Sequence, residues 1–123
     1  MNRPSVRRLD AASEFATSER CSIVEVSNSG DDDAVSIARA RVAPGVTTRW
    51  HRLADTAERY VILEGTGRVE VGDDVREAVT AGDVVLIPAG VAQRIANVGE
   101  GDLVFLAICT PRFRGENYKE IDE

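Results

Sequence analysis

Two stretches decide the fold of this chain: Gly45-Val-Thr-Thr-Arg-Trp-His-Arg-Leu-Ala-Asp-Thr-Ala-Glu-Arg-Tyr-Val-Ile-Leu-Glu-Gly65 and Gly82-Asp-Val-Val-Leu-Ile-Pro-Ala-Gly-Val-Ala-Gln-Arg-Ile-Ala-Asn97. Residues 59–63 and 83–87 are short runs rich in β-branched residues, which are typical of β-strands. Glycine permits the tight turns at strand ends, and Pro88 cannot continue a strand ladder. Both stretches therefore predict short strands joined by turns.

The same pattern extends outward over most of the chain. Turn signals recur roughly every 8–12 residues, as in a β-sandwich or barrel. No long segment has the apolar period of an amphipathic helix. The chain is therefore predicted to be all-β, an antiparallel jelly-roll β-barrel, which deals with open sheet edges. The expected strands are 21–26, 34–42, 47–53, 59–63, 68–71, 75–79, 83–87, 93–96 and 103–109.

The length of 123 residues suits one domain with one core. We expect a single domain over residues 1–123. It would comprise a polar N-terminal segment (1–20), a barrel (21–110) and a polar tail (111–123). The N-terminal segment is expected as a short strand or as an arm on a partner subunit. Cys21 and Cys109 each lie at one end of an apolar run, and we expect buried, reduced thiols there.

Composition excludes several functions. The formal net charge is −6 and the arginines are scattered among acids along the chain, so we expect no nucleic acid partner. No apolar run approaches the roughly 20 residues that span a bilayer, so no membrane association is expected. The first 17 residues lack the apolar stretch of a secretory signal, which makes a cytoplasmic location the default expectation.

The two stretches resemble the paired signatures of the cupin superfamily. The first signature is Gly, five residues, His, one, His, three or four, Glu, six, Gly. The second is Gly, five residues, Pro, one, Gly, two, His, three, Asn. This chain matches both except that Leu53 replaces the second His of the first signature and Gln93 replaces the His of the second. The matching positions are Gly45, His51, Glu58, Gly65, Gly82, Pro88, Gly90 and Asn97.

The resemblance also implies a metal site. In the family, the two His and the Glu of the first signature and the His of the second surround a divalent metal. This chain retains His51 and Glu58, and it offers the weaker amide oxygen of Gln93. These three residues are the expected ligands of Zn²⁺, Fe²⁺, Mn²⁺ or Ni²⁺. The alternative is a neutral His51 hydrogen-bonded to Glu58 or Gln93 without metal.

Strand alternation places several of these side chains on one face each. We expect catalytic roles for His51, Glu58 and Tyr60, with Tyr60 as a general acid, a substrate-positioning hydroxyl or a wall residue. Arg49 would bind a carboxylate or phosphate, or be ion-paired. The expected substrate pocket is lined by Arg49, Leu53, Tyr60, Gln93 and Ile95.

Two functions follow from the resemblance. The first is an enzyme of isomerase, lyase or dioxygenase type, metal-dependent and acting on a polar sugar- or acid-like small molecule. The second is a non-catalytic binding module without metal. A structural partner of another protein ranks third. Trp50 alternates with His51 and should face outward, and together with the N-terminal segment it suggests a homodimer.

Overall fold

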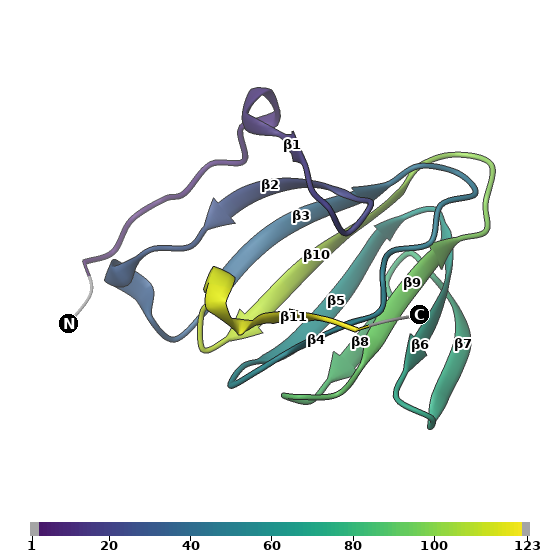
Figure 1. Ribbon diagram of the computed structural model, residues 1–123. Helices are drawn as coiled ribbons and strands as arrows, with labels where there is room; N and C mark the ends of the chain where they lie inside the picture. The colour runs from purple at the N-terminus through teal and green to yellow at the C-terminus, as the bar shows by residue number, and fades with distance from the viewer. Residues whose placement is uncertain (1–2, 122–123) are drawn as a thin grey trace.

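The computed structural model describes residues 3–121 and shows two antiparallel sheets facing each other (Figure 1). One sheet has the order β1-β2-β3-β10-β5-β8 and the other β11-β4-β9-β6-β7. The predicted all-β jelly roll is confirmed. The strands are β1 (Phe15–Ala16), β2 (Ser22–Ser27), β3 (Ser36–Val42), β4 (His51–Leu53), β5 (Ala57–Glu64), β6 (Thr66–Val71), β7 (Val75–Thr80), β8 (Val84–Ile87), β9 (Gln93–Asn97), β10 (Leu103–Thr110) and β11 (Tyr118–Glu120).

The core lies between the sheets because alternate residues of each strand point inward. In β5, Glu58, Tyr60 and Ile62 are buried while the residues between them are partly exposed. Ile62, Ile95 and Leu103 are among the fully buried side chains. Apolar residues from both sheets form one cluster, and β4, β5 and β9 add the buried polar side chains His51, Glu58 and Gln93 to the interior.

Two of the signature residues, Gly65 and Asn97, stabilise connections between strands. Gly65 joins β5 to β6 with a φ of +85°, and a Cβ there would lie 2.6 Å from the carbonyl oxygen of Asp102. The Nδ2 of Asn97 donates to the carbonyl oxygens of Val42 and Gly101, each at 2.8 Å. These positions therefore serve the fold.

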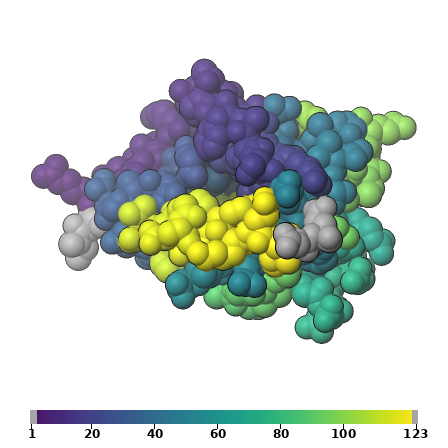
Figure 2. Space-filling model, in the orientation of Figure 1, coloured from purple at the N-terminus to yellow at the C-terminus, as the bar shows by residue number. Residues whose placement is uncertain are grey.

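Both chain ends are structured where the sequence shows little pattern. β1 pairs with β2 of the same chain, so the N-terminal segment contains the short strand that was one of its two expected forms. The predicted polar tail contains β11, which pairs with β4. Strands of two or three residues are too short to show alternation. The N-terminal and C-terminal segments lie side by side on one face (Figure 2).

Helix in residues 3–121 is limited to short 3₁₀ segments. They are η1 (Ala11–Ser13), η2 (Gly30–Asp32) and η3 (Gly115–Asn117). No helix in this part of the chain is long and apolar enough to cross a membrane.

Candidate functional site

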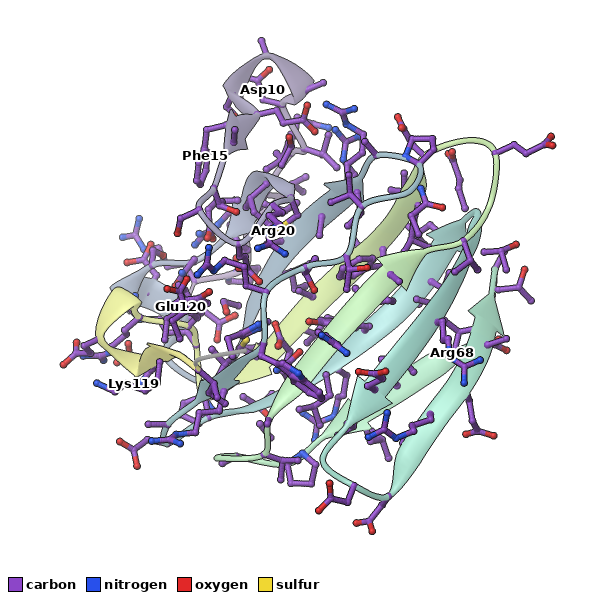
Figure 3. The ribbon with its side chains drawn as sticks, turned by 45° about the vertical axis from the view of Figure 1, so that its right-hand side comes forward. Asp10, Phe15, Arg20, Arg68, Lys119 and Glu120 are labelled. Atoms are coloured by element: carbon purple, nitrogen blue, oxygen red, sulfur yellow. The ribbon has the colours of Figure 1, made fainter. Side chains whose placement is uncertain are left out.

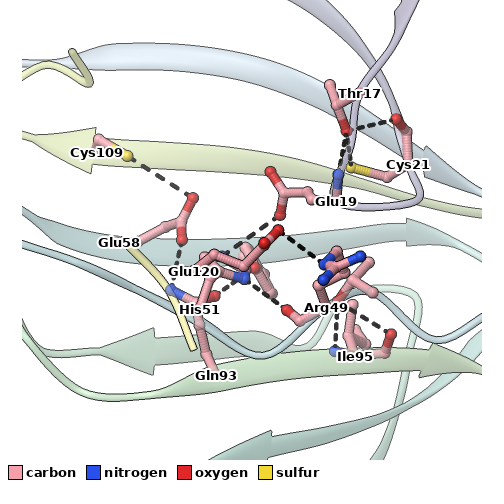
Figure 4. A network of polar contacts seen from close by, with 12 residues as sticks. Thr17, Glu19, Cys21, Arg49, His51, Glu58, Gln93, Ile95, Cys109 and Glu120 are labelled. Carbon is pink, nitrogen blue, oxygen red and sulfur yellow. Dashed lines mark hydrogen bonds and ion pairs between the residues drawn. The ribbon is translucent and has the colours of Figure 1, made fainter. Parts of the chain in front are cut away.

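Glu58 is a buried carboxyl of β5, with 8% of its surface exposed. Its Oε1 accepts a hydrogen bond from Gln93 Nε2 at 2.8 Å, and its Oε2 faces the Cys109 thiol at 3.7 Å (Figure 4). Burial raises the pKa of Glu58 to about 7, and the Glu19 carboxyl adds to the rise, while the bond from Gln93 opposes it. Glu58 is therefore divided between its acid and carboxylate forms near neutral pH.

Gln93 connects Glu58 to Tyr60. The amide nitrogen of Gln93 donates to Glu58, and its Oε1 accepts from the Tyr60 hydroxyl. Gln93 is fully buried, and the Tyr60 ring packs against Phe105 with ring centroids 4.4 Å apart. Burial and the nearby acids raise the pKa of Tyr60 well above its usual range, so its hydroxyl stays protonated. Tyr60 thus fixes the orientation of Gln93.

His51 lies at the start of β4 and faces an acid outside the predicted set. Its Nδ1 is 2.8 Å from the Arg49 carbonyl oxygen, which can only accept, so Nδ1 carries a hydrogen. Its Nε2 is 3.4 Å from Glu19 Oε2. Burial raises the pKa of Glu19, and the charge of His51 opposes that rise. Nε2 is therefore the imidazole nitrogen that faces an ionisable partner.

A cavity of about 230 Å³ opens beside these groups, between the six-stranded sheet and the two chain ends. Glu58 and Cys109 form part of its wall, and Glu19 and Tyr118 form another part. The Tyr118 ring stacks on His51 at 5.1 Å. The remaining wall consists of Phe15, Thr17, Ser18, Ile23, Glu25, Ser36, Ala38, Ala107 and Phe113.

The lining of this cavity differs from the predicted pocket. Of the predicted site residues, Glu58 alone belongs to the wall. Gln93 lies behind Glu58, and His51 lies behind Glu19 and Tyr118. Tyr60 is buried behind Gln93 and does not line the cavity. The other predicted pocket residues also lie outside the cavity wall. These are Arg49, which pairs with Glu120 at 2.7 Å, and the buried Leu53 and Ile95.

The predicted metal ligands do not fit a divalent ion as they are arranged. Gln93 Oε1 accepts from Tyr60, Glu58 Oε1 accepts from Gln93, and His51 Nε2 faces Glu19. Within residues 3–121, no group of three or more His, Cys, Asp or Glu is placed to hold an ion. No chemical step is therefore derived through a metal. Metal binding stays a prediction, which metal analysis of the purified protein tests.

The alternative prediction for His51 is wrong about its partners. His51 was expected to bond Glu58 or Gln93, and it contacts the Arg49 carbonyl and Glu19 instead. The reason is that residues 17–21 turn back over β4, where the Glu19 carbonyl oxygen accepts from the Arg49 backbone nitrogen at 3.2 Å. This turn positions the Glu19 side chain above the imidazole.

Glu19 and Tyr118 are the functional candidates that the sequence did not reveal. Glu19 lies in a polar segment without alternation, and Tyr118 lies in a polar tail. The one local signal is the apolar ring of Tyr118 among charged neighbours. Their position depends on pairing of the chain ends with distant strands, which short-range patterns do not encode.

A family model described as a cupin domain matches residues 38–109, more than half of the chain. The chain belongs to the cupin family. The matched range contains both signature stretches, with Leu53 and Gln93 at the two substituted positions. Most of the cavity wall comes from residues outside that range, whereas Ala38, Glu58, Ala107 and Cys109 of the wall lie within it.

Two curated relatives are about one third identical to this cupin over the residues that align. It is 34% identical over 86 residues to "Endoribonuclease YbeY" of Myxococcus xanthus, covering 68% of this chain and 28% of that protein. It is 33% identical over 82 residues to "Uncharacterized protein MJ1618" of Methanocaldococcus jannaschii, covering 67% and 65%. The matches thus span less than two thirds of either relative.

Among solved structures, this cupin superposes on Pac13, described as a unique nucleoside dehydratase, with a TM-score of 0.76. The two chains are 11% identical, and the match covers 95% of this chain and 92% of Pac13. Another structure of the Streptomyces protein was solved with uridine. At this identity the likeness shows the fold alone.

Other expectations have mixed outcomes. Cys21 and Cys109 are both buried and free, as predicted.

Trp50 is partly exposed, and the Arg94 guanidinium lies 4.6 Å from its ring centroid. Glu14 of the N-terminal segment pairs with Arg39 and Arg41 of the same chain. The homodimer and the cytoplasmic location stay predictions, and the mass in solution tests the first.

Proposed function

We propose that this cupin binds a small molecule in the cavity and transfers protons to and from it, in a reaction of isomerase or lyase type. The observation that carries the proposal is Glu58: a carboxyl that lines the cavity, is held in place by Gln93, and has a pKa of about 7. A general acid or base works best when its pKa is near the working pH.

Glu58 has one oxygen suited to reaction. Oε1 is held by the amide of Gln93, and Oε2 has the longer contact to the Cys109 thiol, which also lines the cavity. In the carboxylate form, Oε2 accepts a proton from a C–H or O–H bond of the ligand. The bond from Gln93 stabilises the charge while it is present.

The Glu19–His51 pair supplies a second proton at the same cavity. Since Nδ1 of His51 is bound to the Arg49 carbonyl, Glu19 beside Nε2 is the member of the pair that lines the cavity and would deliver the proton to the ligand. One carboxyl takes a proton as the other delivers one, so a ligand can be isomerised or can lose water without any oxidant. Two acids with different environments at one site are a known arrangement for such chemistry.

Tyr60 is a positioning residue in this proposal. Its hydroxyl donates to Gln93 and does not line the cavity. The fold likeness to Pac13, a nucleoside dehydratase, is compatible with lyase chemistry in a barrel of this shape. It does not determine the substrate.

Deuterium incorporation tests the proposal. A panel of small hydroxy, keto and amino compounds is incubated with the protein in D₂O and followed by proton NMR. We expect at least one compound to exchange a C–H hydrogen or to be converted by the wild type. Glu58→Gln should lose this activity by about a hundredfold or more, because proton transfer contributes on that order. Activity that survives in a folded Glu58→Gln variant would contradict the proposal.

A non-catalytic binding module is the second candidate. The observation in its favour is that the Tyr60–Gln93–Glu58 chain is internally hydrogen-bonded, as a purely structural network would be. In that case a ligand that saturates the cavity would be recovered without deuterium and unchanged after long incubation.

A further inference from the structure

The ionisable groups of the cavity are nearly all acids. Glu19, Glu25 and Glu58 line it, and among its described lining residues there is no lysine or arginine. Arg49 is the arginine whose charge acts on Tyr118 of the wall, and it is paired with Glu120 at 2.7 Å. An anionic ligand would therefore enter without a cationic partner, which is unfavourable in a partly buried site.

The cavity retains negative charge even when His51 is counted. When the imidazole is protonated, Glu19 and His51 form an ion pair that carries no net charge. Glu25, an exposed residue of β2 that borders the cavity, and the Glu58 carboxyl remain. The pKa of each of the three glutamates is raised chiefly by burial. A bound cation would lower all three and release protons.

Aromatic rings complete the wall. Phe15, Phe113 and Tyr118 line the cavity, and ring faces attract cations. The Tyr118 hydroxyl oxygen is buried without a hydrogen-bond partner among the described residues. Buried polar atoms are normally paired, so this hydroxyl is an unusual feature of the wall.

We propose that the ligand of this cavity is a small organic cation, an amine or amidine with an apolar or aromatic part, bound by the glutamates and the aromatic wall. This inference rests on the proposed function for the location of the site, and it replaces the sugar- or acid-like ligand expected from the sequence. A volume of about 230 Å³ suits a molecule with a single ring.

The test compares three probes of one shape and different charge: benzylammonium, benzyl alcohol and benzoate. Their binding to the full chain is measured by isothermal titration calorimetry at pH 7 in two buffers of different ionisation enthalpy. We expect benzylammonium to bind about tenfold or more tightly than benzyl alcohol, and benzoate not to saturate. Heats of binding that differ between the two buffers would report protons released or taken up on binding.

A charge variant and its control sharpen the test. Glu25→Gln removes a charge at an exposed position, so the protein should fold, and we expect benzylammonium to bind about threefold to tenfold more weakly. The affinity for benzyl alcohol should not change. Glu77→Gln, an exposed glutamate of β7, is the matched control and should leave both affinities unchanged.

The inference is overturned if benzyl alcohol or benzoate binds as tightly as benzylammonium, or if no probe binds. Either result leaves the proposed proton transfer by Glu58 to be decided by the deuterium experiment, so the two failures are distinguishable.

Discussion

Two hollows of this protein carry opposite charge. The cavity between the chain ends is lined by three glutamates. A groove of about 180 Å³ on the outside of the five-stranded sheet, here called the arginine groove, is lined by Arg20, Thr47, Arg68, Glu70, Arg94 and Ala96. Phe15 of the cavity and Arg68 of the groove lie far apart in the molecule (Figure 3).

The pKa of a glutamate shifts in opposite directions in the cavity and in the arginine groove. Burial raises the pKa of Glu58 in the cavity. Hydrogen bonding to Arg94 at 2.6 Å, with further attraction from its charge and that of Arg76, lowers the pKa of Glu70 in the groove. The difference teaches that the environment, and not the number of acids in the chain, decides which glutamates can exchange a proton near neutral pH.

The largest expected effect is the pH dependence of stability that Glu58 of the cavity causes. The folded-state pKa of Glu58 is raised, so the folded protein holds this proton more tightly than the unfolded chain. Stability from this group is therefore greatest at low pH and falls as pH rises from about 4.5 to about 7, by up to about 3 kcal/mol. Glu58→Gln should remove this loss and be more stable than the wild type at pH 8. Urea unfolding of both proteins at pH 5 and pH 8 measures it, and an unchanged pH dependence in the variant would contradict the assignment.

Tyr60→Phe should weaken the network behind the cavity. It leaves the buried Oε1 of Gln93 without its donor, at an expected loss of about 1–2 kcal/mol in the free energy of unfolding. Chemical denaturation measures this loss. Tyr118→Phe removes a hydroxyl that has no partner and is the matched control, with little expected change. Equal losses in the two variants would refute the role of Tyr60.

Arg94→Ala tests the groove side and should have the smallest effect. The substitution removes the main partner of Glu70, so the pKa of Glu70 should rise towards its ordinary value. It also uncovers the Trp50 ring, with a loss of about 0.5–1 kcal/mol. The lowered pKa of Glu70 contributes stability that is present above its ordinary pKa and is lost as pH falls, the reverse of Glu58. Trp fluorescence during acid titration follows this loss, and an unaltered acid transition in the variant would count against the pairing.

The sequence predicted the fold well because its decisive information is local. Apolar and β-branched runs bounded by turn signals identified nine of the strands, and residues such as Gly65 and Asn97 mark turns whose geometry depends on few neighbours. The strand ahead of Leu53 was expected from residue 47, yet β4 begins at His51, and Thr47 forms a single bridge with Ala96.

The site was predicted only in part because it depends on contacts distant in sequence. The convergence of Glu58 with Gln93 follows from the strand faces, whereas Glu19 reaches His51 through a turn of the N-terminal segment. Likewise the arginines look scattered along the chain, but strand register brings Arg76 and Arg94 onto either side of Glu70. Register between strands is set by the whole barrel and cannot be read from one segment.

The central claim is that Glu58 is a proton-exchanging acid at neutral pH, and its carboxyl titration tests this most directly. The protein is labelled with ¹³C at the glutamate side-chain carboxyls, and the Glu58 signal is assigned by its absence from Glu58→Gln. A midpoint of about 7 is expected for Glu58, well above that of Glu70 in the same spectra. A Glu58 midpoint near 4.5, the ordinary value for a glutamate, would contradict the account.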